Sequence, residues 1–122
     1  MKIENIKFKA KKTLDGKWIK GDLVHHKDSD NVWMTDFEKR LTSPVDPDTV
    51  CMFTGLKDRK GKEIFEHDLI HFVGHKPIGE VIWSEEDYAF MIASKNESLY
   101  LLSDVLEIGK IERVGNKFDK EK

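Results

Sequence analysis

The feature that most constrains the fold is a series of short apolar segments that recur at close spacing and are separated by turn-forming residues. Segments of this length, bounded by glycine, proline and charged loops, are typical of β-strands. Their spacing predicts a small all-β or barrel-like unit. The fold class expected is therefore mainly β, with a β-rich α+β arrangement as the alternative. The segments are residues 6–10, 18–25, 32–34, 50–53, 64–65, 69–73, 80–83, 88–93 and 108–114.

The N-terminal segments carry the clearest local signals. Ile6, Phe8 and Ala10 alternate with lysines, which predicts a half-buried strand with the lysines on its other face. The pair Asp15-Gly16 favours the positive φ angles of a tight turn and predicts that a hairpin begins there. Gly21 lies inside the next apolar segment, where a missing side chain predicts a bulge or bend.

Two segments fit more than one conformation. Residues 35–43 fit either a short helix or a loop. The prolines that follow, within 43–48, exclude a helix interior because they remove backbone donors and bias the preceding residues to extended forms. Residues 99–106 have apolar positions at helical spacing, but the same stretch also fits a strand that ends in a turn.

Length and composition bound the class of protein. A chain of 122 residues fits one domain, and 39% hydrophobic residues with three Trp and seven Phe exclude a disordered chain. The single cysteine, Cys51, excludes an internal disulfide and a zinc site built from several thiolates. No run approaches the ~18 apolar residues of a membrane span, and the N-terminus lacks a signal-peptide stretch. We expect a cytoplasmic protein without membrane contact.

The charges are unevenly distributed. Residues 1–20 carry seven lysines against two acids, a balance of +5, whereas residues 21–106 carry nine bases against seventeen acids, a balance of −8. A basic strand face can contact nucleic-acid phosphates, but a solvated strand face kept from aggregating by its lysines is the favoured interpretation. The candidate nucleic-acid contacts are Lys7, Lys9, Lys11, Arg59 and Lys60.

Three histidines, His67, His71 and His75, recur every four residues. Imidazoles gathered on one face can bind zinc or nickel. Four residues of strand span about 13 Å at a rise of ~3.3 Å per residue, too far to share one ion, and Gly74 and Pro77 interrupt a helix. We therefore expect no metal and no cofactor, with these histidines as weak metal candidates.

The chain also lacks a catalytic signature. Cys51 lies in an apolar run without an activating positive charge, which is typical of a small core residue. The acidic cluster at 85–87 fits a solvated tip between two strands better than acid–base chemistry. The sequence contains no phosphate-binding glycine loop, nucleophile elbow or zinc-protease motif. We expect no catalytic residues and no enzymatic activity.

Three tryptophans are the candidate interface residues. Trp18, Trp33 and Trp83 are each able to line a groove or a partner-binding surface if they are exposed. Trp83 alternates with Val81, so burial in the core or in an interface is the other interpretation for it. Exposure of these rings favours contacts with other proteins.

The middle of the chain, residues 54–70, holds a long ordered motif. It resembles the hallmark of the YopX protein family of bacteriophages and prophages, T-G-L-x-D-x-x-G-x-x-I-[YF]-E-G-D-[IL]-[VI]. Further matching pieces follow the expected order at residues 6–10, 14–21, 45–50 and 114–118. The motif positions are Thr54, Gly55, Leu56, Asp58, Gly61, Ile64, Phe65, Glu66 and Asp68.

The resemblance implies one YopX-like domain over residues 1–122. It implies an N-terminal β part with a hairpin at 1–53 and a small SH3-like β-barrel at 54–118. The family it points to has no established biochemical activity. We therefore expect a non-enzymatic phage or prophage protein that acts through protein–protein contacts, as a homo-oligomer or with an unknown phage or host protein. The alternative is a nucleic-acid-associated accessory factor that uses the N-terminal lysines and the loop at 57–62.

One motif position departs from the family pattern. His67 stands where the family has glycine, and a glycine at a strand entry commonly provides a positive φ angle. If φ at His67 is positive, the histidine costs about 1 kcal/mol. In that case we expect His67→Gly to stabilise the protein.

Overall fold

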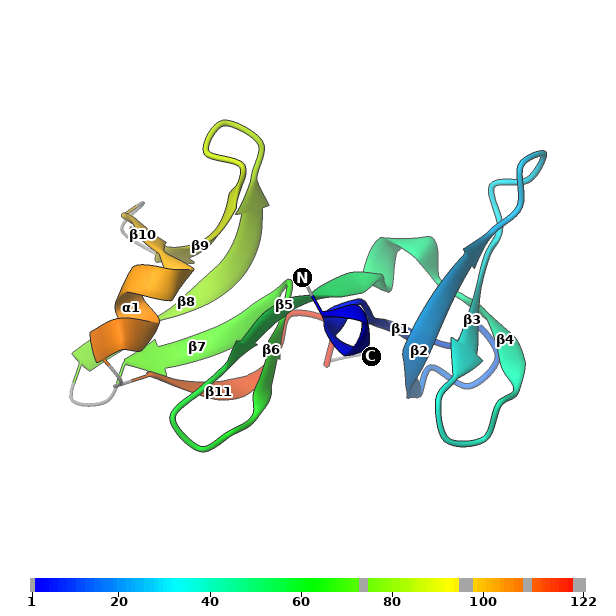
Figure 1. Cartoon of the computed structure of the whole chain (residues 1–122), viewed down its shortest axis with the longest axis horizontal. Coiled ribbons are helices and arrows are strands. Elements are labelled where there is room, and N and C mark those ends of the chain that lie inside the picture. The colour runs from blue at the N-terminus through cyan, green and yellow to red at the C-terminus, as the bar shows by residue number, and fades with distance from the viewer. Residues whose placement is uncertain (1, 73–74, 95–97, 109–110, 120–122) are drawn as a thin grey trace. The chain divides into compact units, whose positions relative to one another are not determined.

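The structure is a computed structural model that describes residues 2–72, 75–94, 98–108 and 111–119. The chain divides into two compact units, residues 1–53 and 54–122, and each is described by itself. In both units the described chain consists mainly of antiparallel strands (Figure 1). The mainly β class predicted from the sequence is confirmed.

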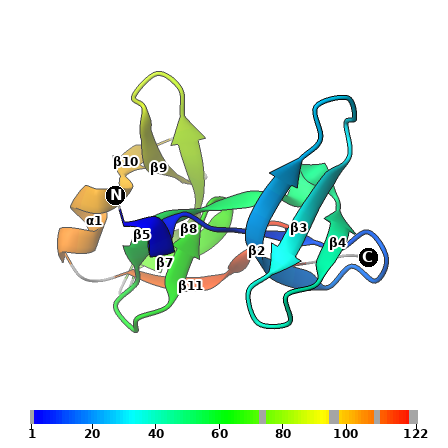
Figure 2. The same ribbon diagram turned by 45° about the vertical axis from the view of Figure 1, so that its right-hand side comes forward.

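The first unit is one antiparallel sheet. Its elements are η1 (Ile3–Asn5), β1 (Phe8–Lys11), β2 (Trp18–His25), β3 (Val32–Asp36), β4 (Thr42–Val45), η2 (Pro47–Thr49) and β5 (Cys51–Lys57), where η marks a single turn of 3-10 helix. The strands lie in the order β4-β3-β2-β1-β5, and Figure 2 shows β4, β3 and β2 side by side. The last strand continues into the second unit, where β6 (Glu63–Phe65) is its neighbour.

Alternation along the strands builds the core of the first unit. Phe8 and Ala10 of β1 share the core face of the sheet, as their spacing predicts. Ile6 does not belong to this face, because the strand begins only at Phe8 and the Ile6 side chain is 45% exposed. The buried centre of this core is Ala10, Ile19, Met34 and Val45.

Two glycines of this sheet act in different ways. Gly16 has φ +72° and closes the predicted hairpin between β1 and β2, where the Asp15 carboxylate accepts a hydrogen bond from the Lys17 backbone N–H at 2.9 Å. Gly21 does not form the expected bulge, because β2 passes it in regular register with both neighbours. A Cβ at Gly21 would lie 1.7 Å from the Thr35 carbonyl oxygen, so glycine is needed there for close strand approach.

Within the segment 35–43, residues 37–41 connect β3 and β4 as a turn without a helix, and the flanking residues belong to the two strands, so the loop alternative is the correct one. The Asp36 carboxylate accepts hydrogen bonds from the backbone N–H groups of Lys39 and Glu38, and these bonds lower the pKa of Asp36. The strand that follows, β4, lies at the edge of the sheet and contains Pro44. An edge position tolerates proline because one row of backbone groups there has no strand to bind.

The second unit contains a sheet with strand order β10-β9-β8-β7-β11 (Figure 1). Its elements are β7 (Asp68–Phe72), β8 (His75–Ser84), β9 (Ala89–Ser94), β10 (Leu99–Leu101), α1 (Leu102–Ile108) and β11 (Ile111–Asn116). The barrel expected for 54–118 is wrong, because β10 and β11 lie at opposite edges of an open sheet in the part of the chain that the structure describes.

The ambiguous segment 99–106 contains both predicted conformations. Residues 99–101 are the edge strand β10, and the helix α1 begins directly after them. Leu102 and Val105 of α1 are buried with Ile64, Ile70, Val81, Ile92 and Ile111 in the core of the second unit. Over the described residues, no helix combines the length and the apolar character that a membrane crossing needs.

The turn between β6 and β7 places His67 in the left-handed region, with φ +71°. The positive φ angle on which the expected effect of His67→Gly depends is therefore present. The ring also makes contacts that the sequence did not reveal: Nδ1 lies 2.7 Å from Glu80 Oε2, and the ring meets Phe118 edge to face at 5.3 Å. These contacts offset part of the backbone cost.

This geometry predicts how substitutions at position 67 rank. We expect His67→Gly to be more stable than His67→Ala by about 1 kcal/mol, because both lose the imidazole and only alanine keeps a Cβ in left-handed backbone. Thermal unfolding followed by circular dichroism measures this as a Tm difference of a few degrees. Compared with wild type, His67→Gly should raise the Tm by less than relief of the left-handed backbone alone predicts, because the variant also loses the ring contacts with Glu80 and Phe118.

A control isolates the ring contact. Glu80→Gln removes the carboxylate beside His67 while the backbone of the turn is unchanged, so we expect a loss of no more than about 1 kcal/mol. Equal Tm values for the glycine and alanine variants would contradict a left-handed His67.

Candidate functional site

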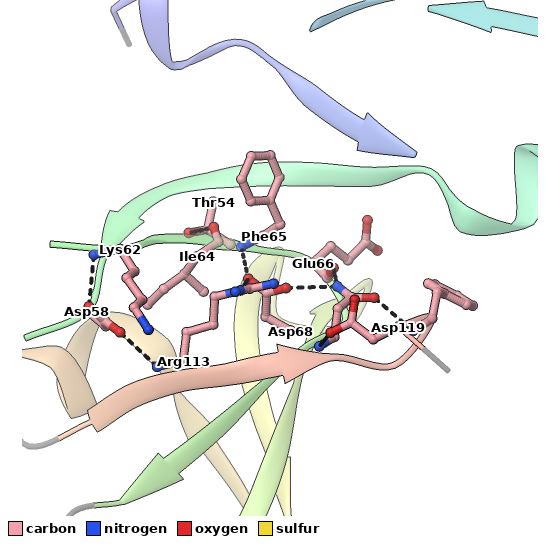
Figure 3. Close-up of polar contacts among 11 residues, drawn as sticks. Thr54, Asp58, Lys62, Ile64, Phe65, Glu66, Asp68, Arg113 and Asp119 are labelled. Carbon is pink, nitrogen blue, oxygen red and sulfur yellow. Dashed lines mark hydrogen bonds and ion pairs between the residues drawn. The ribbon is translucent and has the colours of Figure 1, made fainter. Parts of the chain in front are cut away.

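The motif at 54–70 spans the end of β5, the loop to β6 and the turn into β7 (Figure 3). The Thr54 hydroxyl donates to the Ile64 carbonyl at 2.7 Å and joins the two strands of this hairpin. Gly55 and Gly61 have φ angles of +85° and +81°, which explains glycine at both positions. Leu56 and Ile64 pack in the core of the second unit, and Ile64 and Phe65 are both fully buried.

The Asp58 carboxylate organises the loop between β5 and β6. One oxygen accepts the backbone N–H groups of Lys60 and Lys62 at 2.8 and 2.9 Å, and the other accepts the backbone N–H of Arg113 on β11 at 2.8 Å (Figure 3). Burial raises the pKa of Asp58, but the bonds from Arg113, Lys62 and Lys60 outweigh it and hold the pKa below its ordinary value. A local turn residue thus fastens the edge strand of the second sheet.

The second motif carboxylate, Asp68, is completely buried. One oxygen accepts the Phe65 backbone N–H at 2.7 Å, and the other accepts the Asn116 side-chain amide at 2.8 Å. Arg113 Nε lies 3.0 Å from the first oxygen as an ion pair, and its N–H is not aligned on an acceptor as a hydrogen bond among the described residues. A buried carboxylate needs such partners, because an uncompensated buried charge costs several kcal/mol.

Two residues of this network, Arg113 and Asn116, were not among the sequence candidates. Asn116 also extends the network to the C-terminal segment. Its side-chain oxygen accepts a hydrogen bond from the Phe118 backbone N–H at 2.9 Å, and its backbone N–H donates to the Asp119 carboxylate at 2.8 Å. The Asn116 amide also donates to the Glu66 carbonyl at 3.4 Å. The only sequence signal was the matching piece at 114–118, which gave no hint of a contact with Asp68, 48 residues away.

Two of the three histidine metal candidates, His67 and His71, are described, and they have different neighbours. The His67 ring faces Glu80 and lies 3.8 Å from a Glu66 oxygen. His71 lies farther along β7, opposite Glu112 of β11, and the side chain of His75 lies outside the described residues. Among the side chains that are described, no group of three or more histidine, cysteine, aspartate or glutamate residues is placed to hold a metal ion.

The three tryptophans do not belong to one unit. Trp18 and Trp33 are half-buried in the first unit, where Trp33 meets the His26 ring edge to face at 6.1 Å. Trp83 lies on β8 in the second unit, is 39% exposed and contacts Phe90 of β9 at a ring distance of 5.1 Å. Trp83 is therefore the most accessible of the three.

The candidate lysines of the first unit lie over aromatic rings. The Lys9 ammonium is 4.8 Å from the centre of the Trp18 ring, and Lys11 is 5.4 Å from the same ring. Lys7 lies 4.8 Å from the Phe53 ring. Lys9 is only 4% exposed, so the fully solvated lysine face expected from the alternation is not what the structure contains. Such cation–π contacts stabilise a lysine that is partly removed from water.

The remaining candidates are dispersed. In the second unit, Arg59 and Lys60 lie 3.7 and 3.8 Å from the Glu112 carboxylate. Cys51 is buried, and its thiol donates to the Thr49 carbonyl at 3.2 Å. The acidic residues 85–87 form the turn between β8 and β9 and are exposed.

The contacts of Asp58 predict a pH-dependent stability. In Asp58→Asn one acceptor oxygen is replaced by an amide that faces a backbone donor, so we expect a loss of about 1–3 kcal/mol at pH 7. Because the folded pKa of Asp58 is lowered, its stabilisation is complete above the unfolded pKa of about 4 and is lost as the pH falls through the folded pKa. The difference in the free energy of unfolding between wild type and Asp58→Asn, measured by urea unfolding, should therefore become smaller from pH 5 to pH 2.

Asp22→Asn is the matched control, because Asp22 is an exposed carboxylate on β2. We expect it to change the free energy of unfolding by less than about 0.5 kcal/mol at every pH. A gap between wild type and Asp58→Asn that stays constant as the pH falls would contradict the role given to the ionised carboxylate.

A protein-family model matches a range of the chain that includes the motif residues. The family model described as YopX protein matches residues 7–121, which is nearly the whole chain. No curated protein matches the chain. The residues that carry the motif hold together β5, β6, β7 and β11, so the family signature encodes the framework of the second unit. The chain belongs to the YopX protein family.

Proposed function

We propose that this phage- or prophage-type protein is not an enzyme and acts through contacts with other proteins, including copies of itself. The observation that carries the proposal is the exposure of aromatic side chains at the end of the β8–β9 hairpin. We call residues 83–90 the β8–β9 tip. Within it Trp83 is 39% and Tyr88 is 76% exposed. Exposed aromatic residues of this kind are enriched where proteins bind partners.

Contacts within the β8–β9 tip preorganise it for binding. Trp83 and Phe90 are directly opposite each other in the β8–β9 register and pack edge to face. The turn is closed by Ser84, whose hydroxyl donates to Asp87 at 3.0 Å and accepts the Asp87 N–H at 3.1 Å. A rigid aromatic surface loses little conformational entropy on binding, which favours its use as a contact site.

Tyr88 strengthens this argument. Its φ angle is +50°, a left-handed conformation that is uncommon for a bulky residue, although its ring is mostly in solvent. Glycine or asparagine at this position would form the turn at lower cost. The ring therefore contributes little to folding, and a role in contacts outside the chain accounts for it.

The use of the motif side chains supports the non-enzymatic part of the proposal. Asp58 and Asp68 are the buried carboxylates of the motif, and their oxygens accept backbone and amide hydrogens that hold strands together. A general acid or base must exchange a proton with a substrate within hydrogen-bond reach. Carboxylates committed to structural bonds are poorly suited to that task.

Light scattering after size-exclusion chromatography tests the proposal. We expect wild type to form species heavier than the 14.2 kDa chain, with a mass that rises with protein concentration. Trp83→Ala and Tyr88→Gly should weaken this association. Tyr88→Gly is the sharper variant, because it removes the ring while keeping or raising stability.

Phe37→Ala is the matched control, since Phe37 is an aromatic residue of the first unit that is 47% exposed and lies outside the tip. It should leave the mass unchanged. A wild-type protein that stays monomeric at every concentration would rule out self-assembly.

The contacts of the N-terminal lysines favour a second candidate function, binding of nucleic acid. Trp18 is half-buried beside Lys9 and Lys11, and single-strand binding surfaces use aromatic rings beside basic side chains in this way. Under this alternative, anisotropy of a labelled single-stranded oligonucleotide should show binding that weakens steeply with added salt. Lys7→Glu with Lys11→Glu should abolish it, whereas Lys39→Glu with Arg40→Glu should not. Absence of binding at low salt would remove the alternative.

A further inference from the structure

The β1–β2 turn has a charge opposite to that of the β8–β9 tip. We call residues 11–17 the β1–β2 tip; it carries three lysines against Asp15, a balance of +2. Asp15 is engaged within this tip, because its carboxylate lies 3.4 Å from the Lys12 ammonium and accepts the Lys17 N–H. At its centre Leu14 is 91% exposed. The β1–β2 tip therefore presents one exposed apolar side chain on a segment with a net positive charge.

The β8–β9 tip presents the complementary pattern. Glu85, Glu86 and Asp87 give it a balance of −3, and residues 83–90 include no lysine or arginine. Its apolar surface consists of Trp83 and Tyr88. Each tip thus has exposed apolar side chains and a net charge, and the two net charges have opposite signs.

These charges decide which pairing is favourable. Two copies that met through the same tip would bring like charges together, which opposes a two-fold symmetric contact at either tip. A contact between different tips joins opposite charges and covers apolar side chains on both partners. We propose that the β8–β9 tip of one copy binds the β1–β2 tip of a second copy of this chain. This inference rests on the proposed self-assembly.

A contact between unlike surfaces has a distinctive consequence. It leaves one tip of each kind free at the ends of any open assembly, so copies add head to tail and form a ring or an open chain. Because Lys17 and the acidic residues 85–87 are exposed, salt screens their attraction beyond about 8–10 Å at physiological ionic strength. The assembly should therefore consist of a concentration-dependent series of sizes that shortens as salt is added.

Charge reversal tests the proposal. Glu85→Lys with Glu86→Lys makes the β8–β9 tip basic and keeps Asp87, which closes the turn. Lys12→Glu with Lys17→Glu makes the β1–β2 tip acidic. We expect each reversed protein alone to self-associate about tenfold more weakly or worse in light scattering. An equimolar mixture of the two should form a heteromer, and a chain with all four substitutions should associate again.

Asp28→Lys with Asp30→Lys is the matched control, because it reverses two exposed acids in a different loop. It should leave the association unchanged, and circular dichroism should show that every variant is folded. If wild type associates but neither reversal weakens it, or if the mixture and the fourfold variant fail to associate, the tip-to-tip contact is wrong while self-assembly stands. If wild type is monomeric throughout, self-assembly and the contact both fail.

Discussion

The buried carboxylate of Asp68 is the interaction on which the second unit depends. It lies at the start of β7 and binds the backbone of β6, the guanidinium of Arg113 and the amide of Asn116 on β11. Removal of a carboxylate from water is unfavourable, so the site exists only when all of these partners are in place. One side chain thereby makes the turn after β6, the edge strand β11 and the C-terminal segment depend on one another.

Asp58 applies the same principle to the backbone of β11. It closes the β5–β6 loop with two local hydrogen bonds and uses its second oxygen for the Arg113 backbone. The family motif therefore combines polar side chains that bond to neighbouring strands, glycines with positive φ angles, and an apolar hairpin. Its polar side chains and glycines serve the fold of the second unit. The two tips, which differ in charge and share exposed apolar side chains, are the surfaces that we assign to contacts with partners.

The sequence predicted features that depend on local chemistry. Alternating residues at Phe8 and Ala10 predicted a half-buried strand, and Asp15-Gly16 predicted the hairpin turn, because side-chain period and φ preference act within a few residues. The positive φ of His67 followed from a glycine position in the family pattern. Errors arose where a distant strand decides the outcome: Gly21 fits the close approach of β3, and Lys9 is buried against Trp18 of β2. The expected barrel failed similarly, because closure requires pairing of strands at opposite edges of the sheet.

By itself the sequence determined the mainly β class, the family and the places where the chain turns, since each is encoded in short-range patterns or in an ordered motif. Only the tertiary structure decided which charges are buried. Nothing near Asp68 in the sequence points to Arg113 and Asn116, more than forty residues away. The same holds for exposure. The sequence does not distinguish among the three tryptophans, and tertiary packing leaves Trp83 more exposed than Trp18 and Trp33. Burial and partner choice depend on long-range contacts, which form only when the chain is folded.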